Sequence, residues 1–113
     1  MELTDSQTYQ NLQLAFDGEL RSSTRYQING IRARQEGYIQ IGNVFEIISG
    51  FEREHATIWL RLINGGDLPN TYDNLLSASE WEDSKGNSIY REYAETARTE
   101  GFDDIAASFD GLA

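Results

Sequence analysis

Apolar residues recur every three or four positions along most of the chain, which is the spacing of amphipathic helices. The first such segment runs from about residue 6 to residue 34, and the second from about 39 to 63. A third segment runs from about 71 to 99, and a fourth starts after residue 101. The pattern therefore predicts an all-α protein of four helices.

The connections between these segments carry clear turn signals. Gly37 is placed to end the first helix as a C-cap. The stretch 64–70, with two glycines and the single proline of the chain, is a loop. Short first and third connections with a longer middle one are typical of an antiparallel four-helix bundle. A coiled-coil dimer fits less well, because turn signals interrupt the pattern too often.

The chain also repeats itself. The hexapeptide ARQEGY at 33–38 returns as ARTEGF at 97–102. Further matches, at offsets of 64 or 63 residues, pair Ile41 with Ile105, Phe45 with Phe109 and Glu19 with Glu82. The sequence therefore predicts two related helical hairpins.

Ionisable residues interrupt the apolar stripes of these helices. The first stripe consists of Leu12, Phe16, Glu19, Ser23 and Tyr26. The second consists of Ile41, Phe45, Ile48, Glu52, His55, Trp59 and Leu62. In the third helix, Glu82 lies on the face of Ala78 and Ile89. Buried carboxylates are costly unless they are paired, protonated or bound to a metal.

Glutamate and histidine together suit iron, manganese or zinc. Glu52 and His55 have the Glu-x-x-His spacing of di-iron carboxylate bundles. We therefore predict a metal site formed by Glu19, Glu52, His55 and Glu82. Simpler alternatives exist, since Glu-x-x-His alone is often a surface pair and Glu54 could be the inward residue. Tyr26 and Tyr90 either pack in the core or hydrogen-bond to the carboxylates.

Composition narrows the possible partners and the possible chemistry of the protein. The formal net charge is −10, from 19 acidic and 9 basic residues, which argues against a nucleic-acid surface. The absence of cysteine excludes disulfides, thiolate metal sites and cysteine nucleophiles. No apolar run is long enough to span a membrane, and the N-terminus lacks the features of a signal peptide. We therefore expect a cytoplasmic protein without nucleic-acid or membrane partners.

These motifs together resemble the di-iron domain of the rubrerythrin family, nearly end to end. The matching stretches are 15–19 (AFDGE) with 25–26, 36–41, 52–56 (EREHA), 74–76 and 94–109. The resemblance implies a ferritin-like bundle in which Glu19, Glu52 and Glu82 bind iron. It makes His55 a ligand in at least one redox state, and Tyr26 and Tyr90 the tyrosines that support the ligands. It also implies peroxide reduction or ferrous iron oxidation in oxidative-stress defence.

The chain departs from the family pattern in several ways. An offset of 64 carries Glu52 and His55 past Ala113, so we expect a fragment or a degenerate homologue with a shortened fourth helix. Lys85 replaces a further iron-binding glutamate, and Gly86 weakens that helix by about 1 kcal/mol relative to alanine. A cysteine-rich rubredoxin-like domain is missing, so electrons would come from a separate partner.

Two further functions stay open at this stage. One is a metal-free structural or interaction module, in which Lys85 neutralises the carboxylates that remain. The other is a metal-storing protein without turnover. A shortened fourth helix would leave apolar surface uncovered, so we expect a homodimer, with or without helix exchange. In one such dimer, two copies of the first hairpin would bring Glu19, Glu52 and His55 together with their symmetry mates.

Overall fold

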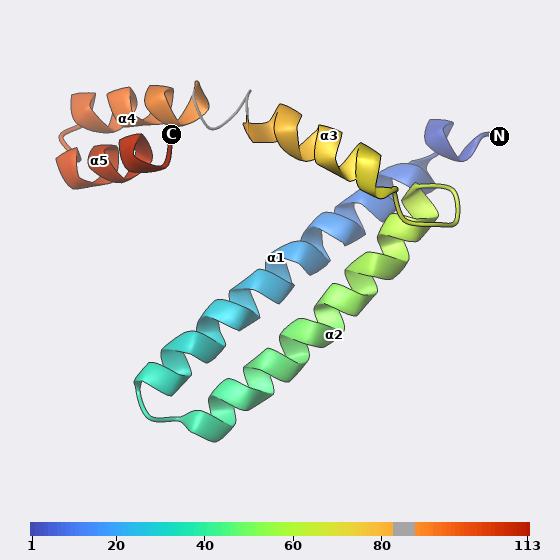
Figure 1. Ribbon diagram of the computed structural model, residues 1–113, viewed down its shortest axis with the longest axis horizontal. Coiled ribbons are helices and arrows are strands. Elements are labelled where there is room, and N and C mark those ends of the chain that lie inside the picture. The colour runs from blue at the N-terminus through green and yellow to red at the C-terminus, as the bar shows by residue number, and fades with distance from the viewer. Residues whose placement is uncertain (83–87) are drawn as a thin grey trace. The chain divides into compact units, whose positions relative to one another are not determined.

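The computed structural model describes residues 1–82 and 88–113 (Figure 1). Its elements are η1 (Leu3–Asp5), α1 (Gln7–Gln35), α2 (Ile39–Ile63), α3 (Thr71–Trp81), α4 (Ile89–Thr99) and α5 (Asp103–Leu112). No strand occurs within these two ranges. The predicted all-α fold class is therefore confirmed. Within the same ranges, no helix has the length and apolar character needed to cross a membrane.

The predicted third helix, 71–99, corresponds to α3 and α4. Residues 83–87 lie between them, outside the described part of the chain, and so do Lys85 and Gly86. The chain divides into two compact units, residues 1–69 and 70–113, which are taken in turn.

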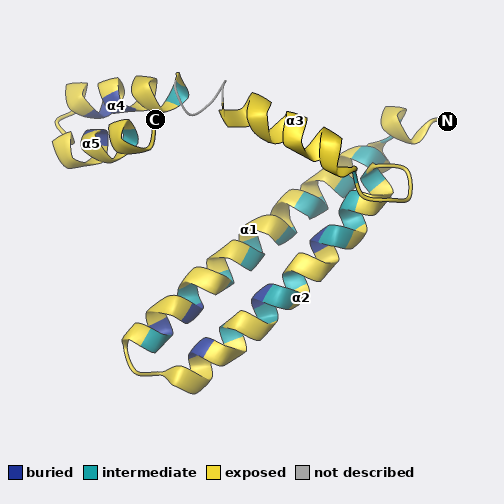
Figure 2. Ribbon diagram, viewed as in Figure 1, coloured by how far each residue is buried: buried dark blue, intermediate teal, exposed yellow. Residues whose placement is uncertain are grey.

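The first unit is an antiparallel hairpin of α1 and α2 (Figure 1). Ser6 caps the start of α1, because its hydroxyl oxygen accepts a hydrogen bond from the Tyr9 N–H at 3.1 Å. Within each helix, the residues that face the other helix recur every three or four positions, as in a coiled coil. We call these facing residues the α1–α2 seam. Figure 2 shows buried and half-buried positions along both helices.

Every residue of the α1–α2 seam is buried or half-buried. From α1 the seam contains Tyr9, Leu12, Phe16, Glu19, Ser23, Tyr26, Gly30 and Ala33. From α2 it contains Gly42, Phe45, Ser49, Glu52, Ala56, Trp59 and Ile63. The predicted stripe of the first helix lies entirely within it.

The predicted stripe of the second helix was partly wrong. Ile41, His55 and Leu62 are exposed, whereas Gly42, Ser49 and Ala56 are buried. On α2, these buried residues therefore each lie one position after a larger residue of the predicted stripe. The physical reason is that small residues let the two helices approach closely, so the larger residues lie on the flank.

The two helices approach each other closely near the turn. A Cβ atom added to Gly30 would lie 3.1 Å from the carbonyl oxygen of Gly42. A Cβ atom added to Gly42 would lie 3.0 Å from the carbonyl oxygen of Gly30. These distances are shorter than ordinary van der Waals contacts, so this layer of the seam requires glycine for its present spacing.

The turn that ends α1 has the geometry of a glycine C-cap. Gly37 has a φ of +89°, and the Tyr38 N–H donates to the Ala33 carbonyl oxygen at 2.8 Å. The turn between α4 and α5 has the same form, because Gly101 has a φ of +88°. There the Phe102 N–H donates to the Ala97 carbonyl oxygen, also at 2.8 Å. The repeated hexapeptide therefore forms the same turn twice.

Side-chain contacts near the two turns repeat as well. The rings of Tyr26 and Phe45 lie 6.0 Å apart between α1 and α2, and those of Tyr90 and Phe109 lie 5.7 Å apart between α4 and α5. Each residue of the second pair follows its counterpart by 64 positions. The second hairpin is thus built like the turn end of the first.

Ion pairs follow the same repeat. Arg34 pairs with Glu46 at 2.5 Å across the first hairpin, and Arg98 pairs with Asp110 across the second. The core of the second hairpin consists of Ala94, Ala97 and Ala106, with Phe109 packed against it.

Candidate metal centre

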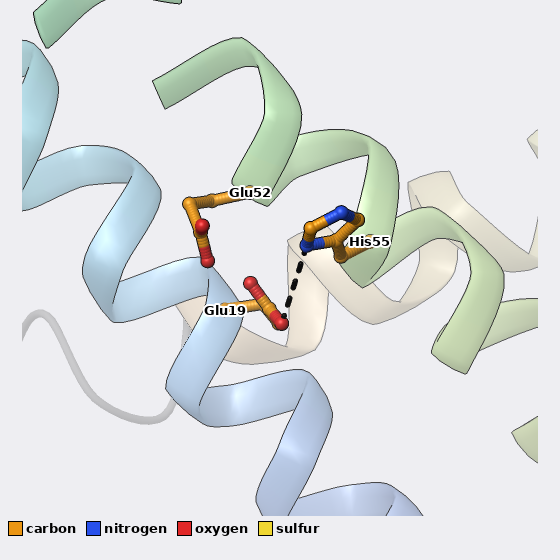
Figure 3. Close-up of side chains that lie close together, drawn as sticks. All are labelled: Glu19, Glu52 and His55. Atoms are coloured by element: carbon orange, nitrogen blue, oxygen red, sulfur yellow. Dashed lines mark ion pairs between the residues drawn. The ribbon is translucent and has the colours of Figure 1, made fainter. Parts of the chain in front are cut away.

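Two carboxylates and an imidazole converge in the middle of the first hairpin (Figure 3). Glu19 comes from α1, and Glu52 and His55 come from α2. Each offers one ligand atom, and these atoms all lie within 4.8 Å of one another. The Nδ1 atom of His55 lies 3.5 Å from Oε1 of Glu19.

The local sequence explains this convergence. Glu19 and Glu52 are seam positions of the two helices, so the pairing of α1 with α2 places them face to face. His55 follows Glu52 by three residues and therefore lies on the same side of α2, one turn further on. Its side chain is 52% exposed, whereas that of Glu19 is 21% exposed. The group thus reaches from the seam to the surface of the hairpin.

Without metal, the carboxyl group of Glu52 holds its proton more strongly than an ordinary glutamate does. The pKa of Glu52 is raised above its ordinary value, mainly by its hydrogen bond with Glu19. Partial burial and the negative charge of Glu19 raise this pKa further, while His55 lowers it. A proton on Glu52 would relieve the repulsion of two carboxylates at close range.

The donor set fits a transition-metal cation. Oxygen atoms of two carboxylates and one imidazole nitrogen suit iron, manganese or zinc. Oε2 of Glu19 is buried and has no hydrogen-bond partner within residues 1–82 and 88–113. A buried carboxylate oxygen without a partner is costly, and a cation at this position would satisfy it. The same cation would offset the repulsion between the carboxylates of Glu19 and Glu52.

Glu52 and Glu54 differ in their position on the hairpin. Glu52 lies in the α1–α2 seam, as predicted, whereas Glu54 is exposed and outside the carboxylate–histidine group of the described chain. The Glu-x-x-His element is therefore more than a surface pair, because its glutamate meets Glu19.

Glu82 does not join this group in the part of the chain that the structure describes. It is exposed and is the C-cap residue of α3, in the second unit. The structural repeat has an offset of 64, which would pair Glu19 with residue 83, outside the described residues. The predicted role of Glu82 stays a prediction, and Lys85 lies outside the described residues.

The two tyrosines also keep the status of predictions. Tyr26 lies in the seam with its ring against Phe45. No hydrogen bond joins it to Glu19 or Glu52 across residues 1–82. Tyr90 belongs to the second unit, where its ring contacts Tyr93 at 6.4 Å and Phe109 at 5.7 Å.

Sequence reasoning placed Ser23 in the first stripe but missed its partner beside the site, Ser49. Ser49 is 4% exposed, and it exchanges hydrogen bonds with Ser23 one turn from the carboxylates. Only the spacing of small residues along the second helix could have revealed this position, because hydrophobic periodicity gives serine no weight.

Comparisons with a family model and with curated proteins point to the same protein family. The family model described as Rubrerythrin matches residues 10–75, a stretch that contains Glu19, Glu52 and His55. Rubrerythrin of Nitratidesulfovibrio vulgaris is 32% identical over 98% of this chain and 64% of its own length. Rubrerythrin-1 of Clostridium acetobutylicum is 34% identical over 95% of this chain and 63% of its own length. Rubrerythrin of Porphyromonas gingivalis is 35% identical over 96% of this chain and 60% of its own length.

The chain thus spans roughly three fifths of the length of these curated relatives. The matched model covers more than half of the chain, and the matches to the relatives extend along nearly all of it. The chain belongs to the rubrerythrin family.

Proposed function

We propose that this chain provides a non-haem iron site for a rubrerythrin-type oxidoreductase, acting in peroxide reduction or in ferrous iron oxidation. One observation carries the proposal: Glu19, Glu52 and His55 bring their ligand atoms within 4.8 Å of one another. Their position inside the matched family region supports the same assignment.

Each residue of the group would have its own role in metal binding. Glu19 and Glu52 would bind the cation through carboxylate oxygen atoms. His55 would bind through a neutral imidazole nitrogen, and its exposed side chain leaves the group open to small molecules from solvent. Iron would supply electrons for the reduction of peroxide to water, and a separate electron donor would restore it.

The first experiment measures the metal content of the 113-residue chain, purified without chelator. We expect about two iron atoms per chain or per dimer, as in di-iron carboxylate bundles. His55→Ala should lose most of this iron, because it removes the only nitrogen ligand of the group. Glu54→Ala is the matched control, since Glu54 is the exposed neighbour outside the group, and it should retain the iron.

A second candidate function rests on the raised pKa of Glu52. Because protonation of Glu52 would relieve its repulsion with Glu19, we infer that the hairpin also folds without metal, as a structural or interaction module would need. A folded, helical protein without stoichiometric metal would favour this module over the iron site. If iron is bound, consumption of hydrogen peroxide or oxidation of ferrous iron by the loaded protein then separates turnover from storage.

We also propose that the protein forms a homodimer. Large apolar side chains are exposed along α2, including Val44, Ile47, Phe51 and Ile58. An exposed apolar surface of this kind favours association. Sedimentation of the metal-loaded protein should give the mass of a dimer. A monomer with a full complement of metal would exclude a site shared between two copies.

A further inference from the structure

A pair of serines connects α1 and α2 directly beside the carboxylates. The hydroxyl of Ser23 donates to the carbonyl oxygen of Ser49 at 2.9 Å. The hydroxyl of Ser49 donates to the carbonyl oxygen of Ser23 at 2.7 Å. The two hydroxyl oxygens lie 3.2 Å apart. We call this arrangement the serine bridge.

The serine bridge differs in kind from the other contacts of the α1–α2 seam. Apolar contacts are non-directional, so they resist separation of the helices more than they resist sliding. Reciprocal hydrogen bonds have short distances and preferred angles, and therefore fix both the separation of the helices and their axial register. Because Ser49 is 4% exposed, water has little access to compete for its bond.

The register matters most for the neighbouring layer of the seam. Glu19 precedes Ser23 by one turn and Glu52 follows Ser49 by one turn, so both carboxylates lie on the same side of the bridge. A slide of one helix by one residue would move Glu19 about 1.5 Å relative to Glu52 and His55. Metal–ligand distances hold to within about 0.2 Å, so even a fraction of this slide would disturb a metal site.

We propose that Ser23 and Ser49 are positioning residues of the metal site, which set the register at which Glu19 meets Glu52 and His55. This inference rests on the proposed function, because it requires that the group binds metal. The serines bind no metal themselves and act through the placement of the two helices.

The test is a titration of the metal-free 113-residue chain with Co²⁺ alone, followed by visible absorption. The double variant Ser23→Ala/Ser49→Ala should bind Co²⁺ about 10-fold or more weakly, as for other residues that orient metal ligands. Its Co²⁺ absorption band should also change, because the band reports the geometry of the ligands. Each single variant should fall between, since one of the two bonds to a backbone carbonyl remains.

Two controls separate positioning from stability. Ser22→Ala makes the same change beside the seam, and should leave the affinity and the band unchanged. Ile63→Val removes a methylene group at the far end of the seam, so it should lower the melting temperature without changing the band. The double serine variant should keep a melting temperature near that of the unmodified chain, because both hydroxyls are removed together and the two carbonyl oxygens keep their bonds within the helices.

The outcomes are distinct. If the unmodified chain binds Co²⁺ and the double variant binds it with the same affinity and band, the positioning role is wrong while the proposed function stands. If the unmodified chain binds no Co²⁺, both the proposed function and the positioning role are wrong. A weaker affinity in the double variant, with an altered band and an unchanged melting temperature, supports the inference.

Discussion

Glu52→Gln should abolish metal binding and, at neutral pH, raise the melting temperature of the metal-free protein. A neutral amide is a poor ligand for iron, so the variant loses one of the two carboxylates of the site. The same amide can still hydrogen-bond to Glu19, and it removes the negative charge that opposes Glu19 in the seam. The substitution thus has opposite expected effects on metal binding and on the stability of the metal-free protein.

The pH dependence of this effect has a definite sign. The folded pKa of Glu52 is raised, so the folded chain holds the proton more tightly than the unfolded chain does. The resulting stability is fully present below the unfolded pKa and is lost as the pH rises through the folded pKa. The variant and the unmodified protein should therefore melt at similar temperatures at low pH, and should diverge as the pH rises toward neutrality.

Circular dichroism melts in the presence of chelator, over a series of pH values, measure this divergence. Glu54→Gln is the matched control, because it makes the same change at the exposed neighbour, and it should show no comparable pH dependence. A lower melting temperature for Glu52→Gln at neutral pH would show that the raised pKa of Glu52 does not govern stability in this layer.

Much of the first hairpin could be predicted from the sequence. The spacing of Leu12, Phe16 and Tyr26 locates the buried side of α1, and Glu19 falls on it. The repeated hexapeptide predicts two similar turns, and both have a glycine with positive φ. The Glu-x-x-His spacing predicts that Glu52 and His55 act together. These features depend on residues close together in the chain, so they can be predicted from a single sequence.

Other features depend on how helices pack, which periodicity does not report. On α2 the larger residues Ile41 and Leu62 suggest a buried stripe, but Gly42 and Ser49 form the contact because they are small. The role of Glu82 stays a prediction, because it depends on the tertiary placement of α3, and spacing within that segment does not report tertiary placement.

Gly42→Val is expected to destabilise the protein by about 1 to 3 kcal/mol, the usual cost of overpacking a close contact. A Cβ atom at position 42 would lie 2.7 Å from Cγ of Arg34 and 3.0 Å from the carbonyl oxygen of Gly30. The arginine side chain can move away, at some cost to its pairing with Glu46. The backbone of Gly30 cannot move without separating α1 from α2.

Gly18→Val is the matched control for this substitution. Gly18 lies in the middle of α1, is exposed, and has no atom within 4 Å of an added Cβ among the described residues. Valine is a slightly better helix former than glycine. The Gly18→Val variant should therefore be as stable as the unmodified chain, or more stable by roughly a few tenths of a kcal/mol. Urea unfolding of the two variants and the unmodified chain measures both effects.

The second hairpin shows why the cost at Gly42 depends on helix spacing. Ala94 and Ala106 follow Gly30 and Gly42 by 64 positions, and both are fully buried. A hairpin of this design therefore accepts methyl groups in this layer when its helices are spaced for them. In the first hairpin the serine bridge opposes such a change in spacing, so Gly42→Val should be better tolerated when Ser23 and Ser49 are also replaced by alanine. An equal cost of Gly42→Val with and without the serine bridge would mean that the two layers of the seam adjust independently.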